Sequence, residues 1–195
     1  MALLQLHEQS SISDPEILGI FEWVTEMEGK VPNHFLLELN FPEFMKAKLG
    51  ATKVLWESGE LSQETIQHVG ILVSRANGCA YCTGAFCTIL GHGLNASEAY
   101  VQELAAEGIS AVKEAELRVV LDFALKVNDE PRAIDERDIA ALKGTGLTDK
   151  GVLQLVHLVS DFATYNRLNL ALKTDYDYAN FGPETGQQVD WPAFD

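Results

Sequence analysis

SRANGCAYCTGAFC, residues 74–87, holds all three cysteines of the 195-residue chain. Two of them, Cys79 and Cys82, form a C-x-x-C pair, and on a helix residues at this spacing lie on one face within reach of each other. Asn77-Gly78 interrupts the preceding helix, which places the pair in the first turn of a new one. Free backbone N–H groups and the helix dipole favour a thiolate there, the nucleophilic form of cysteine. The stretch therefore predicts a redox dithiol, with two small buried apolar side chains as the alternative.

Length and composition fit one globular domain. The chain is 47% hydrophobic and 22% charged, and a chain of this length buries a sizeable core without disulfides or metals. We therefore expect a single domain over residues 1–195, with its core between about residues 12 and 175. Three cysteines clustered in one short stretch are not a disulfide framework and indicate a reducing cytoplasm.

The charge and hydropathy of the chain argue against several classes of partner. The net charge is −15 and the pI about 4.6, whereas binding of nucleic acid or of anionic membrane surfaces needs basic clusters. No stretch approaches the about 18 apolar residues of a membrane span, and the opening MALLQLHEQ lacks the basic residues of a signal peptide. We expect neither a nucleic-acid partner nor a membrane.

Helical periodicity and capping signals extend over almost the whole chain, so the sequence predicts an all-α fold. Ser62 is the expected N-cap of the helix that leads to the cysteines, and Ile66, Val69 and Val73 belong to its buried stripe. The other helices are expected at residues 17–27, 34–39, 42–56, 79–90, 95–106, 112–127, 135–144 and 149–173.

Two of these helices resemble each other in sequence. Leu61-Ser62 corresponds to Leu147-Thr148, and Val73-Ser74 corresponds to Val159-Ser160, at one offset of 86 residues. A capped apolar helix that recurs in this way is a modest signal of a duplicated helical unit, since apolar helices resemble one another easily.

The C-terminal residues differ in composition from the rest. Residues 174–195 contain no Lys or Arg, and acidic side chains are interspersed with aromatic ones. Such a segment cannot build its own core. We expect residues 176–195 to form an acidic aromatic tail whose rings dock on this subunit or on a neighbouring one.

VSRANGCAYC, residues 73–82, resembles the alkyl hydroperoxidase D / carboxymuconolactone decarboxylase superfamily, most closely its peroxidase-related branch. The same resemblance covers most of the chain from residue 12 to 175, through GKVPN at 29–33, LS at 61–62, GLT at 146–148 and NR at 166–167. It implies the all-α fold of that family and a homo-oligomer, either a trimer or a hexamer made as a trimer of dimers. It also implies a small-molecule substrate, a hydroperoxide or a small carboxylate, and a thiol or lipoyl-type reductant.

Active members of that family carry a glutamate, then the C-x-x-C pair, then a histidine four positions after the second cysteine. The resemblance implies Cys82 as the attacking thiol and Cys79 as the resolving thiol, with the glutamate and the histidine relaying protons. In this chain Gln67 occupies the glutamate position and Phe86 the histidine position. Neither side chain exchanges a proton at neutral pH, so we expect low peroxidase activity.

Three histidines are candidates for the missing proton relay. His68 adjoins Gln67 but points about 100° away from it around the helix. His92 lies in a Gly-His-Gly break from which it can fold back, and His157 stands four residues before Asp161, a spacing that favours a pair. Each also has a structural interpretation: His68 packed or at the surface, His92 in a loop and His157 in the core.

Tyr81, Cys87 and Arg167 complete the chemically notable side chains. Tyr81 lies between the two cysteines and is a candidate supporting residue. Cys87 points about 140° away from Cys82 and is expected in the core, so three thiols with His92 do not make a zinc site. Arg167 is interpreted as a helix-end or subunit contact, with binding of a substrate anion as the alternative.

We predict a cytoplasmic thiol oxidoreductase of the antioxidant type, which reduces hydroperoxides or exchanges disulfides through Cys79 and Cys82 without a cofactor or metal. Two other classes stay open: a non-catalytic binding or assembly protein on the same scaffold, and a decarboxylase-like or isomerase-like enzyme acting on a small carboxylate. Broad apolar helix faces and the aromatic tail favour a homo-oligomer.

Overall fold

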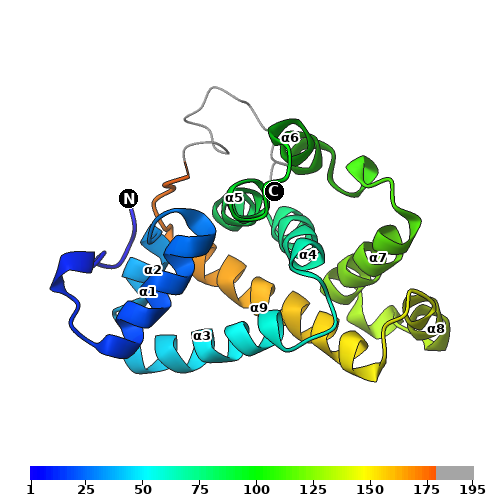
Figure 1. The fold of residues 1–195 in the computed structure, drawn as a ribbon, viewed down its shortest axis with the longest axis horizontal. Coiled ribbons are helices and arrows are strands. Elements are labelled where there is room, and N and C mark those ends of the chain that lie inside the picture. Colours follow the sequence, from blue (N-terminus) through cyan, green and yellow to red (C-terminus); the bar gives the residue numbers. More distant parts are fainter. Residues whose placement is uncertain (179–195) are drawn as a thin grey trace.

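The computed structural model describes residues 1–178, and within them all regular elements are helices (Figure 1), which confirms the predicted all-α fold. None of these helices is long and apolar enough to cross a membrane. The α-helices are α1 (Pro15–Glu28), α2 (Asn33–Glu38), α3 (Pro42–Glu57), α4 (Gln63–Ala76), α5 (Ala80–Thr88), α6 (Glu98–Glu107), α7 (Ala115–Asp129), α8 (Glu136–Gly144) and α9 (Asp149–Leu172). Short 3₁₀ or π turns are η1 (Gln9–Ser11), η2 (Ile89–Gly93), η3 (Gly108–Ala111) and η4 (Pro131–Ala133).

Helix α4 lies at the centre of the fold, packed against α5, α7 and α9 (Figure 1). Helices α1, α2 and α3 lie on one side of this centre, and α6, α7 and α8 on the other. Buried apolar side chains form a large cluster around α4 and a smaller one among α1, α2 and α3. The two helices with related sequences, α4 and α9, therefore pack directly against each other, while the duplication itself stays a prediction.

Helix α4 forms where its cap and its apolar stripe predict it. The hydroxyl of Ser62 accepts a hydrogen bond from the backbone N–H of Thr65 at 3.1 Å, which satisfies one of the free donors of the first turn. Ile66, Val69 and Val73 are completely buried. Because α4 is packed against several other helices, it holds the start of the cysteine helix in place.

A tight turn separates α4 from α5. Gly78 adopts a left-handed φ of 70°, which glycine reaches without steric cost. The backbone N–H groups of Gly78 and Cys79 donate to the carbonyls of Arg75 and Ser74 at 3.1 and 2.8 Å, the pattern of a Schellman helix end. The predicted break before the cysteines is therefore confirmed.

Asparagine side chains tie this turn to the neighbouring helices. The amide of Asn77 donates to Asn166 in α9 at 2.9 Å and to Asn128 in α7 at 3.0 Å. Asn166 in turn donates to the hydroxyl of Ser74 at 2.9 Å. Three helices thus fix the position at which α5 begins.

Two predicted helix starts are wrong. Ser97 caps α6 by accepting a hydrogen bond from the N–H of Tyr100, whereas Asn95 lies in the preceding turn with a φ of 59°. Helix α7 begins at Ala115 instead of at residue 112, because the chain first makes the turn η3. Both errors come from loops whose local turn geometry overrides the apolar pattern.

Candidate functional site

Cys79 and Cys82 lie at the start of α5, as predicted, and both are free thiols. Cys79 is the N-cap residue, and its sulfur accepts a hydrogen bond from the backbone N–H of Cys82 at 3.4 Å. The two residues are only 1% and 4% exposed. The pair is therefore preorganised at a helix N-terminus and shielded from bulk water.

The surroundings shift the pKa values of the two thiols in opposite directions. The hydrogen bond from the Cys82 thiol lowers the pKa of Cys79, and backbone N–H groups at the helix start add to this effect. Burial raises the pKa of Cys82 well above its usual value, and the neighbouring Cys79 raises it further. Cys79 is therefore the more acidic thiol of the pair.

Only Cys82 of the pair contributes to the wall of a cavity of about 70 Å³. Most of that wall is aromatic or aliphatic, and its titratable members besides the thiol include Glu28 and His34. The lining residues are Trp23, Met27, Glu28, His34, Phe35, Leu49, Thr52, Trp56, Tyr81, Cys82, Ala85, Phe86, Ile89, Phe162, Tyr165, Asn169 and Tyr178. The cavity has the character of a site for a small apolar molecule.

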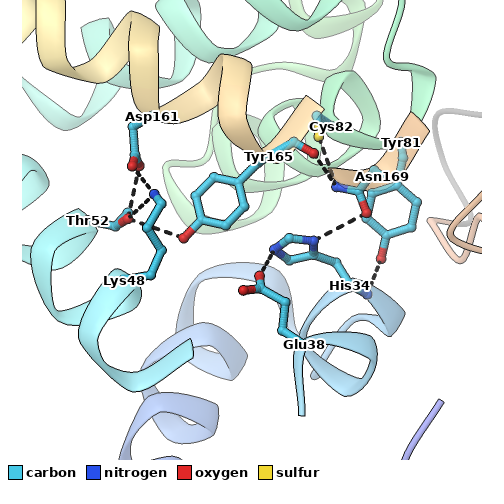
Figure 2. Close-up of polar contacts among 9 residues, drawn as sticks. All are labelled: His34, Glu38, Lys48, Thr52, Tyr81, Cys82, Asp161, Tyr165 and Asn169. Carbon is cyan, nitrogen blue, oxygen red and sulfur yellow. Dashed lines mark hydrogen bonds and ion pairs between the residues drawn. The ribbon is translucent and has the colours of Figure 1, made fainter. Parts of the chain in front are cut away.

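A chain of polar contacts connects the Cys82 sulfur to a buried ion pair (Figure 2). The amide of Asn169 donates to the sulfur at 3.2 Å, and its oxygen lies 3.2 Å from Nδ1 of His34. Nε2 of His34 lies 2.8 Å from a carboxylate oxygen of Glu38. Because both ring nitrogens lie next to oxygen atoms, this arrangement favours the doubly protonated form of His34.

The charge of Glu38 keeps His34 protonated. Burial alone lowers the pKa of a histidine, but the ion pair with Glu38 and the contact with Asn169 outweigh it, so the pKa of His34 is raised above its usual value. A buried imidazolium beside the dithiol favours negative charge on sulfur, and it is also a proton donor on the cavity wall.

His34, Glu38 and Asn169 are site residues that were not predicted from the sequence. His34 and Glu38 are four residues apart on α2, a spacing that signals a possible pair. Asn169 lies on α9, far along the chain. The signal that these residues meet the cysteines is absent from the sequence, because it depends on how α2 and α9 pack against α5.

Phe86, at the family's histidine position, belongs to an aromatic cluster. Its ring centroid lies 4.6 Å from that of Phe162 and 6.4 Å from that of Trp56. The ring fits because Gly70 has no side chain: a Cβ there would lie 2.5 Å from it. Gln67, at the family's glutamate position, is completely buried, and its amide finds no partner within residues 1–178. Phe86 and Gln67 are therefore packing residues and do not relay protons.

The predicted histidine candidates all lie off the cavity wall. His68 is buried, with its ring nitrogens 2.7 Å from the carbonyl of Glu64 and 2.7 Å from the hydroxyl of Tyr100, so it is a packed histidine. His92 lies in η2 with its ring against Gly29.

Cys87 is completely buried, and burial raises its pKa to about 12. Within residues 1–178, no three His, Cys, Asp or Glu side chains are grouped as metal ligands.

The prediction for His157 is wrong, because its side chain is exposed. Its expected partner Asp161 instead forms an ion pair with Lys48 and accepts a hydrogen bond from Thr52 at 2.9 Å (Figure 2). The hydroxyl of Thr52 also lies 3.2 Å from that of Tyr165, which lines the cavity. Asp161 is thus linked through Thr52 to Tyr165 on the cavity wall.

Tyr81 links the start of α2 to the C-terminal segment. Its hydroxyl accepts a hydrogen bond from the backbone N–H of His34 and donates one to Asp177, both at 2.9 Å. The other carboxylate oxygen of Asp177 accepts from Lys30 at 2.9 Å and from the N–H of Asn33 at 3.1 Å. The first residues of the expected tail therefore dock on their own subunit, while residues 179–195 lie outside the described part of the chain.

Glu28 is a buried carboxyl on the cavity wall. It is 8% exposed, and the hydroxyl of Tyr178 donates to it at 2.6 Å. Burial raises its pKa to about 7, an effect that His34 and Lys30 partly offset. The site therefore holds a carboxyl that titrates near neutral pH.

The raised pKa of Glu28 should make the stability of the protein depend on pH. Between the usual pKa of 4.5 and about 7, the folded protein keeps a proton that the unfolded chain has released, so the free energy of unfolding falls as pH rises. The full change contributed by Glu28 is about 3 kcal/mol. We expect Glu28→Gln to remove this fall when urea unfolding is measured at pH 5 and pH 8. Glu26→Gln, at an exposed position of the same helix, is the control, and an equal pH dependence in both variants would contradict the assignment.

Solved structures with the same fold include peroxidase-related proteins and a debrominase. One is described as an alkylhydroperoxidase AhpD core, an uncharacterized peroxidase-related protein from Ralstonia eutropha JMP134. It has a TM-score of 0.82 and 25% identity over 92% of this chain and 94% of its own. An uncharacterized peroxidase-related protein from Silicibacter sp. TM1040 has a TM-score of 0.78 and 25% identity over 93% and 94% of the two chains.

A cysteine-to-alanine variant of the debrominase Bmp8, in complex with 2,3,4-tribromopyrrole, has a TM-score of 0.78 and covers 97% of this chain and 98% of its own. At 18% identity it shows a shared fold alone. No protein-family model matches the sequence, and no curated protein matches it either. The helical fold, its nearly complete overlap with the two peroxidase-related proteins and the cysteine pair at the start of α5 together place this chain in the alkyl hydroperoxidase D-like superfamily.

Proposed function

We propose that the protein is a thiol-dependent oxidoreductase, in which Cys82 attacks a small hydroperoxide inside the cavity and Cys79 resolves the product as a disulfide. One observation carries this proposal: Cys82 lines an apolar cavity whose wall also holds His34, a histidine with a raised pKa. A nucleophile, a proton donor and a shielded space are the parts that such a reaction needs.

In the proposed reaction the Cys82 sulfur bonds to the terminal oxygen of the hydroperoxide, the O–O bond breaks, and the thiol proton of Cys82 passes to Cys79. The leaving alkoxide takes a proton from His34 and departs as an alcohol, leaving Cys82 as a sulfenic acid. Cys79 then attacks that sulfur, water leaves, and the disulfide forms. A small thiol or lipoyl-type dithiol returns the pair to thiols and is itself oxidised, and His34 regains its proton from solvent.

Acidity and access favour different cysteines as the attacking group. The lowered pKa favours Cys79, whereas only Cys82 borders the cavity. We give access the greater weight, because a thiolate that does not face the substrate cannot attack it. The side chain of Cys79 is hydrogen-bonded to the Cys82 thiol, so Cys79 is placed to accept the proton that Cys82 must lose.

In this proposal His34 and Glu38 take over the task of the family's missing histidine and glutamate. Their ion pair lies on α2, whereas the family's two positions lie on α4 and α5. His34 reaches the cavity itself, and it also orients Asn169, which donates to the Cys82 sulfur. A protonated His34 next to the substrate stabilises the negative charge that develops on the leaving oxygen.

An uncharged substrate fits this cavity better than a carboxylate. The positive charge of His34 is matched by Glu38, and Glu28 adds a second carboxyl. Arg167, the proposed anion ligand, is exposed and donates to the carbonyl of Ala163. The debrominase of the same fold binds a brominated aromatic ring, 2,3,4-tribromopyrrole, whereas a cavity of about 70 Å³ favours a smaller molecule.

The function is tested by following thiols and substrate together. One equivalent of ethyl hydroperoxide is expected to be consumed while alkylation and mass spectrometry detect a loss of two of the three free thiols, those of Cys79 and Cys82. Dithiothreitol should restore both. If all three thiols persist and the hydroperoxide is not consumed, the non-catalytic binding protein replaces our proposal.

We further propose a cytoplasmic homo-oligomer. Exposed apolar side chains support association: Phe41, Phe44 and Val54 lie at or on α3, and Leu153 and Leu170 lie on α9. The rings of Phe41 and Phe44 stack with centroids 5.7 Å apart, and contiguous exposed apolar surface commonly marks contacts between proteins. The trimer or hexamer implied by the family resemblance stays a prediction.

A further inference from the structure

We infer that Tyr178 determines the size of the substrate that reaches Cys82. This inference rests on the proposed function for its kinetic test, but not for its binding test. Tyr178 lines the cavity together with Cys82 and is 4% exposed. The cavity, about 70 Å³, is about half the size of an engineered apolar cavity of roughly 150 Å³ that binds benzene. At this size the site excludes ring-sized substrates.

Tyr178 is held in place from several directions. Its hydroxyl donates to Glu28 at 2.6 Å. Its ring lies 5.3 Å from the ring of Tyr81 and 5.8 Å from that of Tyr176, and the ammonium of Lys30 lies 5.1 Å from its centroid. These contacts make Tyr178 a fixed part of the wall.

The backbone around Tyr178 is anchored as well. Asp177 accepts from Tyr81, Lys30 and the N–H of Asn33. The carbonyl of Asp175 accepts from the Asn33 amide at 3.0 Å, and its carboxylate accepts from the backbone N–H of Ala2 at 3.0 Å. The segment therefore cannot shift to admit a larger molecule without breaking several charge-assisted hydrogen bonds.

Tyr178 differs from the other lining residues in its place in the fold. The others belong to α1, α2, α3, α5, η2 and α9, whereas Tyr178 follows the last helix. Trp56, Phe86 and Phe162 also hold those helices together through their aromatic contacts. Shortening one of them would loosen the packing between those helices, whereas shortening Tyr178 enlarges the cavity at a residue outside them.

The kinetic test compares Tyr178→Ala with Tyr178→Phe. Removing the ring adds about the space of one benzene molecule, so we expect Tyr178→Ala to raise the ratio of kcat/KM for cumene hydroperoxide over ethyl hydroperoxide by at least about tenfold. Tyr178→Phe loses the bond to Glu28 but keeps the ring, and should leave the ratio within about twofold. Tyr178→Leu should shift it by an intermediate amount and replaces the alanine variant if that variant does not fold. An unchanged ratio in the folded smaller variant overturns the inference.

A binding test needs no turnover. In a Cys82→Ser background, iodobenzene is titrated while the fluorescence of Trp23 and Trp56, which line the cavity, is followed. We expect Tyr178→Ala to lower the Kd for iodobenzene at least about tenfold relative to Tyr178→Phe. If this difference appears but no form of the protein consumes hydroperoxide, the size limit stands and the proposed function fails. If hydroperoxides are consumed and neither the ratio nor the Kd changes, the role of Tyr178 is wrong.

Discussion

Replacing Cys82 by serine is expected to lower the rate of hydroperoxide reduction by at least about a thousandfold, because removal of an attacking side chain leaves no alternative nucleophile on the cavity wall. Cys79→Ser should behave differently. Its Cys82 still attacks once, so it consumes one equivalent of hydroperoxide and stops at a sulfenic acid that dimedone traps. Stopped-flow consumption and mass spectrometry of the dimedone adduct measure the two outcomes.

The third cysteine supplies the matched control. Cys87 is completely buried, and its pKa is raised to about 12, so Cys87→Ala should retain turnover if the protein folds. The assignment of the attacking thiol is reversed if Cys82→Ser consumes one equivalent of hydroperoxide while Cys79→Ser consumes none. In that case acidity would outweigh access in this pair, and Cys79 would have to reach the cavity by a movement of α5.

Replacing His34 by glutamine is expected to lower the rate about a hundredfold at pH 7, the usual contribution of a general acid. The pH profile gives the sharper result. The pKa of His34 is raised above its usual value, so the imidazolium is present at lower pH and is lost as pH rises through that pKa. The native rate should therefore fall on the alkaline side, and His34→Gln should lack this fall.

Two further variants separate proton donation from packing. Glu38→Gln keeps the imidazole but removes the charge that raises its pKa, so the alkaline fall should move to lower pH. His68→Gln changes another buried histidine, hydrogen-bonded but away from the cavity wall, and should leave the pH profile unchanged. Equal profiles in all three variants would mean that His34 only supports the fold of α2.

Local signals in the sequence determined most of the fold. Ser62 at the start of α4, the Asn77-Gly78 turn and the apolar stripe between them depend on hydrogen bonds and periodicity within a few residues, and all appear as predicted. Local signals of the same kind place Cys79 and Cys82 at the start of α5. The predicted start of α6 at residue 95 was wrong because Asn95 lies in the loop before the helix and Ser97 caps it.

The sequence by itself therefore determined an all-α chain with a dithiol at a helix N-terminus and without the family's usual relay residues. Only the tertiary structure decided what surrounds the dithiol: His34 and Glu38 from α2, Asn169 from α9 and Tyr178 from beyond the last helix. The periodicity of a helix shows which face is apolar, but not which other helix that face will meet. Contacts between residues more than eighty positions apart, such as Asn169 with Cys82, arise from packing of the whole chain, and it is this packing that makes the site.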